Sequence, residues 1–457
     1  MRAALAVVAL IILLLIGGAW WLKCESQRPY AALVAKVEAL GRKTPFDIDV
    51  HAGLPGLRSV SVRLLSGTSS YELLTESYPP QSWRGSLLAD KRLHIESDLN
   101  ELRVPEGPVT LVVTADTYAW HLWSSGAVAA LNTPLTLDLT PPLIAPLTTQ
   151  HNIRLGGVDM VVFRQSPDTV SSGVEVGKYF FPATTGYFAD SAVALALFAV
   201  PQDLDLGAEP RLVARDAAGN RREVALACSI APQRFAERTL SIDDAFLTRK
   251  VPDLERLNGL PTNPNLVEGY LQINRDLRLK DESRLHEITA TSAPEPLWNG
   301  AFHRQSNAAP LSSFADRRTY LYRGDVIDHQ THLGYDLASL KLAPVEAAQN
   351  GKVVFADNLG IYGNTVVLDH GLGIFSLYGH LSTIAVHVGD PVGVKQTLGQ
   401  TGETGLAGGD HLHFSIMLHG IHVDPVEWWD AHWLRDHVTS KLALFPRAGA
   451  QKAGQQR

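Results

Sequence analysis

The sequence has only two cysteines in 457 residues, Cys24 and Cys228, so a disulfide framework is excluded. Two separated cysteines also cannot form a thiolate zinc cluster. Cys228 alternates with Val224 and Leu226, which predicts a buried free thiol in a strand. There is no basic excess either, because 40 Lys and Arg stand against 47 Asp and Glu, a net charge of −7. The composition therefore argues against nucleic acid as a partner, since phosphates would not be neutralised.

Charged residues are also missing from Ala3 to Leu22, and a helix of that length spans about 30 Å, the thickness of a bilayer core. Trp20 and Trp21 stand at its far end, where an aromatic belt is expected. We predict that residues 1–24 are an uncleaved single-pass membrane anchor. Its N-terminus would face the cytoplasm, and the following domains would be extracytoplasmic, in the periplasm.

The residues argue against three alternatives to this anchor. A cleaved signal peptide needs small residues before the cut, and Trp20-Trp21-Leu22-Lys23 supplies none. A lipid anchor on Cys24 needs a small residue at position 23, where the chain has lysine. A buried core helix fits poorly with so long an apolar run at the start of a chain.

The residues after the anchor are long enough for several domains. Leu33, Val37 and Leu40 recur at helical spacing and predict a juxtamembrane helix over 25–44. Short alternating strands broken by Gly, Pro, Asn and Ser then predict two β-sandwich domains, 45–140 and 141–232. The stretch from Ala214 to Asn220 resembles the last hairpin of bacterial immunoglobulin-like modules.

The sequence pattern of the remaining chain changes twice, first to helical spacing and then to strands. Residues 233–295 predict a short helical linker, in which Leu266, Tyr270, Ile273 and Leu277 repeat at helical spacing. Residues 296–430 are rich in strands with glycine at the turns and predict an antiparallel β-sheet domain, followed by a C-terminal tail over 431–457. The predicted fold class is mainly β, with one N-terminal transmembrane helix and two Ig-like sandwiches before the last domain.

Histidine is concentrated in that last domain, because twelve of the 17 histidines follow residue 300. In a strand, His411 and His413 point to the same face. His332 and Asp336, four residues apart, also share a face in an extended segment, and Gly334 between them leaves space for an ion. His380 ends an apolar strand. Each pattern alone is also typical of surface residues, but together they predict a zinc site, since zinc prefers imidazole and carboxylate ligands.

The order and spacing of these motifs resemble those of a known protein family. The chain reads His332-Leu-Gly-Tyr-Asp336, then Tyr378-Gly-His380-Leu381, then a glycine-rich turn from Gly402 that leads into His411-Leu-His413-Phe414. The segments Gly363 to Gly371 and Val423-Asp-Pro425 match as well. Over roughly 130 residues this pattern resembles the lysostaphin/LytM-type zinc metallopeptidases, which cut peptide bonds in bacterial peptidoglycan.

The resemblance implies a role for each residue. His332, Asp336 and His413 would hold Zn²⁺, while His380 and His411 would line the cleft as catalytic residues, one taking a proton from water and the other binding the oxyanion. The residues do not say which histidine has which role. Asp410 stands where many members have proline, and it would either orient an imidazole or end the loop.

The functional prediction is a membrane-anchored zinc metalloendopeptidase with peptidoglycan as substrate. The alternative is a non-hydrolytic regulator of other cell-wall hydrolases, although relatives of that kind lack zinc ligands. A third reading makes the sandwiches adhesion or spacing modules with a vestigial hydrolase, which would bring cell-envelope proteins as partners. We also consider that the segment from Ser241 to Glu287 lies in the cleft and supplies an extra ligand.

Overall fold

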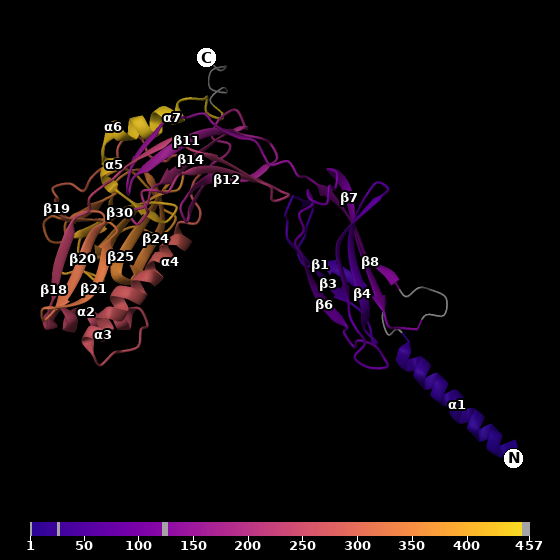
Figure 1. Ribbon diagram of the computed structural model, residues 1–457. Helices are drawn as coiled ribbons and strands as arrows, with labels where there is room; N and C mark the ends of the chain where they lie inside the picture. Colours follow the sequence, from indigo (N-terminus) through magenta and orange to yellow (C-terminus); the bar gives the residue numbers. More distant parts are fainter. Residues whose placement is uncertain (1, 25–27, 121–126, 450–457) are drawn as a thin grey trace. The chain divides into compact units, whose positions relative to one another are not determined.

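The computed structural model describes residues 2–24, 28–120 and 127–449 (Figure 1). The chain forms two compact units. The first comprises Met1–Pro142, Asp168–Val170 and Ala214–Arg222, and the second comprises Leu143–Pro167, Ser171–Val213 and Glu223–Arg457. Helix α1 (Arg2–Lys23) begins the first unit, and its window Ala6–Lys23 alone among the described residues is long and apolar enough to cross a membrane.

The rest of the first unit is two sheets that enclose one core. The three-stranded sheet has the order β1 (Tyr30–Leu33), β3 (Phe46–His51), β6 (Asp90–Ile95). The five-stranded sheet has the order β2 (Ala39–Leu40), β8 (Ala127–Leu137), β7 (Gly107–Thr117), β4 (Leu57–Ser66), β5 (Ser69–Ser77). Ile48 of the first sheet and Val62 of the second are buried in the same cluster, as the alternating pattern of both strands requires.

The predicted juxtamembrane helix over 25–44 is wrong for its described part, residues 28–44. This segment forms strands β1 and β2 instead, which pair with β3 and β8. Leu40 is fully buried in the sandwich core, and Leu33 and Val37 pack against that core. The apolar residues that suggested a helical face are therefore buried by sheet pairing, because tertiary contacts override local spacing in so short a segment.

The N-terminal part of the second unit is also built from strands. One sheet has the order β14 (Val193–Ala199), β11 (Val158–Gln165), β9 (Ile144–Pro146). Another has the order β13 (Tyr179–Pro182), β12 (Thr169–Val176), β15 (Arg211–Asp216), β16 (Arg221–Ala225). A parallel pair joins β10 (His151–Arg154) to β17 (Cys228–Ala231). Cys228 is a free thiol in a strand, as predicted, but it is only partly buried.

An eight-stranded sheet forms the centre of the last domain. Its order is β19 (Ala309–Ser312), β22 (Tyr335–Ala338), β30 (Leu412–Leu418), β26 (Ile374–Leu381), β25 (Gly363–Gly371), β24 (Gly351–Leu359), β28 (Pro391–Val392), with β31 (Ile421–Val423) on β30. Two three-stranded sheets flank it, with the orders β18 (Glu237–Ile242), β20 (Asp316–Tyr322), β21 (Asp325–His332) and β23 (Pro344–Glu346), β29 (Thr397–Gln400), β27 (Thr383–Ile384). The mainly β fold with antiparallel strands in this domain is confirmed.

The predicted helical linker contains helices, but it is part of this domain's core. Its helical elements are α2 (Asp244–Leu257), α3 (Leu266–Gln272), the π-helical turn η1 (Ile273–Leu277) and α4 (Arg278–Ile288). The predicted face is confirmed, because Tyr270, Ile273 and Leu277 are buried in one cluster with Phe375 and Leu377 of β26. The short 3₁₀ turn η2 (Gly360–Tyr362) joins β24 to β25 beside these helices.

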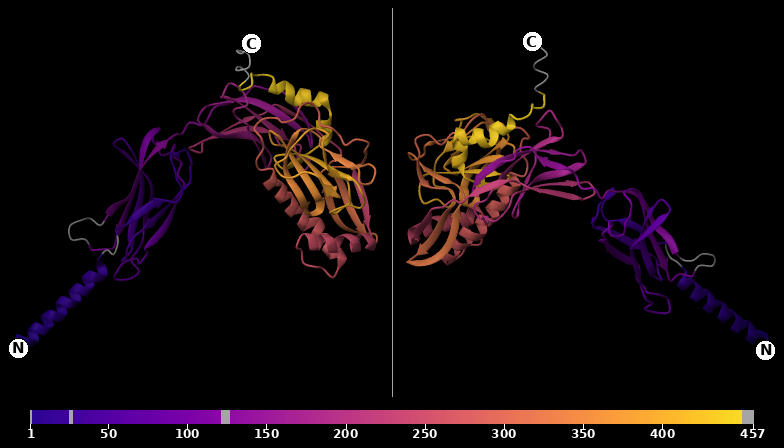
Figure 2. Two further views of the ribbon diagram at one scale, coloured as in Figure 1. Left: turned by 180° about the vertical axis from the view of Figure 1, so that it is seen from behind. Right: turned by 45° about the horizontal axis from the view of Figure 1, so that its top comes forward.

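The tail after residue 430 begins with helices as well. After α5 (Pro425–Trp429) come α6 (Ala431–Leu434), η3 (Arg435–Thr439) and α7 (Ser440–Leu442). Figure 2 shows these helices at the end of the unit away from α2 and α3. Lys441 donates a hydrogen bond to the carbonyl of Met160 on β11, at 2.9 Å, so the tail is fastened to the preceding strands. The last residues, 450–457, lie outside the described part of the chain.

Candidate active site

Three strands bring His332, Asp336 and His413 together. His332 ends β21, and Asp336 on β22 lies directly opposite His413 on β30 in the antiparallel register. Directly opposed residues point to the same face of a sheet, so the carboxylate and the imidazole meet. Gly334 lies between the first two residues, and a Cβ there would come within 2.5 Å of the His413 ring. The predicted space at Gly334 is therefore occupied by the His413 imidazole.

The three side chains point one atom each at a common position. His332 Nε2 lies 3.0 Å from His413 Nδ1 and 3.0 Å from Asp336 Oδ1, and His413 Nδ1 lies 3.1 Å from Asp336 Oδ1. Ligand atoms bound tetrahedrally to zinc at about 2.0–2.1 Å lie about 3.3 Å apart. Two nitrogens and one oxygen at this separation fit a zinc ion with a fourth position open, and all three residues are buried.

The other nitrogen of each imidazole fixes its tautomer. His332 donates from Nδ1 to the carbonyl oxygen of Ser313 at 3.0 Å. Ser415 donates its hydroxyl proton to the carbonyl of Leu333, so its oxygen accepts from His413 Nε2 at 3.0 Å. Both rings therefore keep an unprotonated nitrogen for the common position, which is how metal-binding histidines are usually oriented.

His380 and His411 stand beside this group and are held in the same way. His380 donates from Nδ1 to the carbonyl of Thr404 at 2.9 Å, and His411 donates from Nδ1 to the carbonyl of Gly409 at 2.8 Å. Their ring centroids are 4.8 Å apart, and His411 Nε2 lies 3.5 Å from Asp336 Oδ1, so the two rings stand together beside the metal-binding group. His380 has a φ of 64°, a left-handed conformation that is uncommon for non-glycine residues.

Burial and neighbouring charges shift the pKa values of His380 and His411 in opposite directions. Burial, together with the imidazoles of His411 and His413, holds the pKa of His380 well below its usual range, so this ring is neutral near pH 7. Burial acts to lower the pKa of His411 too, but the hydrogen bond and charge of Asp336 outweigh it and the pKa is raised. Asp336 is an ionised carboxylate, because its histidine neighbours outweigh burial and hold its pKa well below the usual range.

Arg318 on β20 also belongs to the site, although no sequence pattern indicated it. Its Nη2 donates to Asp336 Oδ2 at 2.9 Å and to the hydroxyl of Ser312 at 3.0 Å. Asp336 therefore binds Arg318 with Oδ2, and its Oδ1 faces three histidines, His332, His413 and His411. Asp410, by contrast, accepts from the Thr401 hydroxyl at 2.6 Å and from the backbone amide of Leu342 at 3.2 Å, so it ties down its loop.

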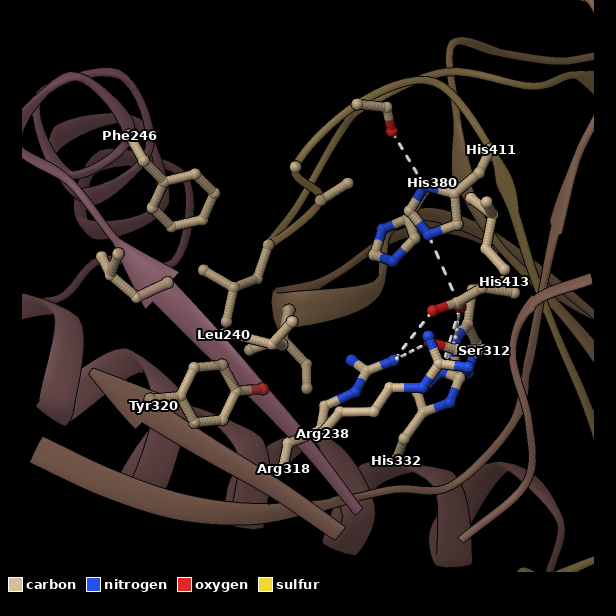
Figure 3. Close-up of a pocket in the computed structure, with 18 of the residues that line it drawn as sticks. Arg238, Leu240, Phe246, Ser312, Arg318, Tyr320, His332, His380, His411 and His413 are labelled. Atoms are coloured by element: carbon tan, nitrogen blue, oxygen red, sulfur yellow. Dashed lines mark hydrogen bonds and ion pairs between the residues drawn. The ribbon is translucent and has the colours of Figure 1, made fainter. Parts of the chain in front are cut away.

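These residues open onto a cavity of about 520 Å³, within the range of ligand sites. Figure 3 shows the histidines on one side and Leu240, Phe246 and Tyr320 on the other. Strand β18 and helix α2 thus form the second wall. The sequence placed this segment in the cleft, but within the described ranges the metal-binding group contains only His332, Asp336 and His413, with no ligand from residues 241–287.

Comparisons with known proteins agree with the position of this site. The model of "Peptidase family M23" matches residues 330–425, which contain all five predicted site residues. The DD-carboxypeptidase/endopeptidase Mpg of Neisseria meningitidis serogroup B is 34% identical over 122 residues, 26% of this chain and 28% of that protein. The murein hydrolase activator EnvC of Escherichia coli is 39% identical over 84 residues, 18% of this chain and 20% of that protein.

A longer match reaches beyond the site. The uncharacterized lipoprotein YgeR of Escherichia coli is 30% identical over 188 residues, which cover 39% of this chain and 72% of that protein. The chain spans only about a quarter of the Mpg and EnvC proteins, so those likenesses concern the C-terminal domain. The resemblance found in the sequence is confirmed, and the chain belongs to peptidase family M23 through this domain.

Proposed function

We propose that this protein is a membrane-anchored zinc metalloendopeptidase that hydrolyses peptide bonds in bacterial peptidoglycan. The observation that carries the proposal is the complete set of five side chains around one position: His332, Asp336 and His413 as metal ligands, and His380 and His411 beside them. The donor set supports zinc, because two neutral imidazole nitrogens and one carboxylate oxygen with an open fourth position are typical of catalytic zinc sites.

When bound there, zinc would supply Lewis-acid chemistry, lowering the pKa of water toward 7 and polarising the scissile carbonyl. The chain's own residues do the rest. The Nε2 atoms of His380 and His411 face the reacting position, because both Nδ1 atoms are bound to backbone carbonyls. One Nε2 takes the proton of the attacking water, and the other, protonated, hydrogen-bonds the oxyanion and later returns a proton to the leaving amine.

Helix α1 and the relatives support the proposed location. The window Ala6–Lys23 is long and apolar enough to span a bilayer, and its side chains are almost all exposed rather than packed in a core. An anchor there would hold the catalytic domain outside the cytoplasm, next to the cell wall. The names of the relatives, a DD-carboxypeptidase/endopeptidase and a murein hydrolase activator, support peptidoglycan as the substrate.

The likeness to EnvC favours a second candidate, a protein that activates other cell-wall hydrolases without cleaving bonds itself. The two candidates differ in what they require of the five side chains. An activator has no use for an intact metal-binding group, and here the group is complete and its tautomers are fixed. The hydrolase is therefore the better supported function.

The test uses the full-length protein in detergent with purified peptidoglycan sacculi. Released fragments are identified by mass spectrometry, which also names the bond that is cut. We expect fragments in the presence of zinc, none after chelation, and none from His413→Ala. Release by His413→Ala would refute the assigned site. No release by the wild-type protein, combined with stimulation of a second hydrolase added to the same sacculi, would favour the activator.

A further inference from the structure

The cavity beside the metal-binding group is lined by more cationic than anionic side chains, although the chain as a whole has a net charge of −7. Three arginines line it: Arg238, Arg278 and Arg318. The lining carboxylates are Asp336, which faces the metal position, and Asp410, which is bound to its own loop. A zinc ion would add further positive charge, so the cavity favours an anionic ligand.

The three arginines differ in what already neutralises them. Arg238 pairs with Asp316 at 2.8 Å, and Arg318 pairs with Asp336 at 2.9 Å. Within the described part of the chain, the hydrogen bonds of the Arg278 side chain all go to Asn274, a neutral residue. Among the ion pairs of the described residues, none includes Arg278, and its Nη1 has no hydrogen-bond partner there.

The π-helical turn η1 positions this guanidinium. In an α-helix the Asn274 carbonyl would accept the backbone N–H of Arg278. In η1 that N–H is bonded to the carbonyls of Ile273 and Arg275 instead. The Asn274 carbonyl is thus free to accept from Arg278 Nε at 3.1 Å, while the Asn274 side-chain oxygen accepts from Nη2 at 2.8 Å. Single π turns of this kind are frequent at functional sites.

Asn274 is itself held in place. It is fully buried, and its Nδ2 donates to Asp328 Oδ2 at 2.8 Å. Arg275 occupies the other oxygen of Asp328 at 2.9 Å. The Arg278 guanidinium is therefore clamped along one edge, and its remaining edge is left for a ligand. A fixed planar fork of this kind suits a carboxylate.

The carboxylates nearest in sequence to Arg278 are already bound elsewhere. Asp281 accepts from the backbone amide of Ile361 at 2.7 Å. Glu282 accepts from the Tyr362 hydroxyl at 2.7 Å and lies 3.1 Å from His422 Nε2. Both lie near enough for the charge of Arg278 to favour their ionised forms, but among the described residues neither forms an ion pair with it, so no carboxylate is bonded directly to the guanidinium there.

A second observation also indicates a missing ligand. Tyr270 lines the same cavity and is 1% exposed, and its hydroxyl has no hydrogen-bond partner among the described residues. Arg318 Nε, on the same lining, is also buried without a partner. Buried donors without partners are rare in proteins, because each costs about 1–3 kcal/mol. A bound anion with several acceptor lone pairs would satisfy donors of this kind.

We propose that Arg278 is the anchor of a substrate subsite that binds a free carboxylate, so that the preferred substrate is a peptide with a carboxylate close to the bond that is cut. This inference rests on the proposed function and names its substrate class. The carboxylate has two possible sources in a wall peptide, a side chain or the C-terminus, and Arg278 would pair with either by the same chemistry.

The test measures binding to the zinc-free full-length protein by calorimetry, so that no probe is hydrolysed. The parent probe is a short cross-link peptide with one side-chain carboxylate and a free C-terminus. Two analogues each replace one of these carboxylates with a carboxamide. We expect one analogue to bind the wild-type protein about 10- to 100-fold more weakly than the parent, as for a charge-assisted hydrogen bond lost from a partly buried site. That analogue identifies the source.

Arg278→Gln should bind this carboxamide analogue and the parent peptide equally tightly. The affinity of the variant for the carboxamide analogue should equal that of the wild-type protein, which would show that the variant is folded. Arg278→Lys keeps the charge without the fork and should discriminate to an intermediate degree. Arg284→Gln is the matched control, since Arg284 is exposed on the same helix and pairs with Glu287, and it should behave as wild type.

Three outcomes would overturn the inference. The wild-type protein could bind all three peptides equally, or it could fail to bind the parent peptide. Arg278→Gln could also discriminate between the parent and the carboxamide analogue as strongly as the wild-type protein does. Digestion of sacculi by the zinc-loaded wild-type protein is measured separately. Digestion without carboxylate discrimination would leave the proposed function standing and remove the subsite. Discrimination without digestion by the zinc-loaded protein would keep the subsite and remove the hydrolase.

Discussion

Arg318 and Asp336 share one short contact, with Arg318 Nη2 2.9 Å from Asp336 Oδ2, and this contact sets the direction of the other carboxylate oxygen. Asp336 Oδ1 then lies 3.0 Å from His332 Nε2 and 3.1 Å from His413 Nδ1. Arg318 also places a positive charge against this buried carboxylate, and with the neighbouring histidines it favours the ionised form over the neutral form that burial alone would favour. Arg318 thus prepares Asp336 to bind a metal through one oxygen.

Replacing Arg318 by Gln should therefore weaken zinc binding. Loss of a residue that orients a metal ligand typically costs about 10- to 100-fold in metal affinity. We expect that range for Arg318→Gln and a smaller loss for Arg318→Lys, measured by competition with a chelator. Arg317→Gln is the control, because Arg317 is exposed and binds Thr331 and Gln202 instead. Unchanged zinc affinity in Arg318→Gln would show that Asp336 is oriented without it.

The family resemblance indicated the three candidate metal ligands from the sequence, although three different strands bring them together. His411 and His413 alternate on one strand, and Gly334 marks where the His413 ring comes closest to the backbone. The positions of Arg318 and Arg278 could not be predicted in this way. Arg318 reaches Asp336 only because β19, β20 and β22 come together, and Arg278 depends on a π turn that has no recognisable sequence signal.

Two helix predictions made from residue spacing had different outcomes. The spacing of Tyr270, Ile273 and Leu277 predicted a helix correctly, because that helix buries one face against a sheet. The spacing of Leu33, Val37 and Leu40 predicted a helix wrongly, because those residues pack on the core of a sandwich instead. Local spacing states which residues are buried, but not whether a helix or a strand buries them.

Alanine variants should separate the proposed zinc ligands from the histidines proposed to be catalytic. We expect bound zinc, measured by elemental analysis, to be lost in His332→Ala and His413→Ala but retained in His380→Ala and His411→Ala. Hydrolysis of sacculi should fall in all four, by about 10²- to 10⁴-fold where only acid–base chemistry is lost. His387→Ala is a suitable control, since its side chain is 91% exposed. Loss of zinc in His380→Ala would reassign that residue as a ligand.

The segment before the catalytic sheet should stabilise the domain rather than inhibit it. Leu277 is 2% exposed and belongs to the same buried cluster as Phe375 and Met417 of the sheet. Leu277→Ala should lower the free energy of unfolding by about 2–5 kcal/mol. Leu279→Ala, two residues away and 68% exposed, should change it by less than about 0.5 kcal/mol.

Urea titration with pulse proteolysis, followed by detection of the C-terminal domain, measures both variants. A detachable inhibitory segment would give the opposite result, with little change in stability and higher activity in Leu277→Ala. The structure favours the first outcome, because the helices and the sheet bury one continuous apolar cluster.

The contact between Glu427 and the backbone amide of Val158 should make the free energy of unfolding depend on pH. Glu427 on α5 is buried and accepts a hydrogen bond from the backbone amide of Val158 on β11, at 2.9 Å. Burial raises the pKa of Glu427 to about 8, and the nearby charge of Asp424 acts in the same direction. The value in an unfolded chain is about 4.3. The folded state therefore favours the protonated form, so this group's stabilisation is complete below pH about 4 and is lost as the pH rises to about 8.

Glu427→Gln should remove this dependence, because the amide is neutral at every pH and its oxygen can still accept from Val158. Between pH 5 and 7 the free energy of unfolding of the wild-type protein should fall relative to the variant, with a slope that approaches about 1.4 kcal/mol per pH unit. Urea titrations of both proteins at several pH values measure that slope. Glu268→Gln, at an exposed position on α3, should leave the wild-type slope unchanged. A constant difference between wild type and Glu427→Gln would mean that Glu427 stays ionised, and that water or a nearby cation compensates its charge.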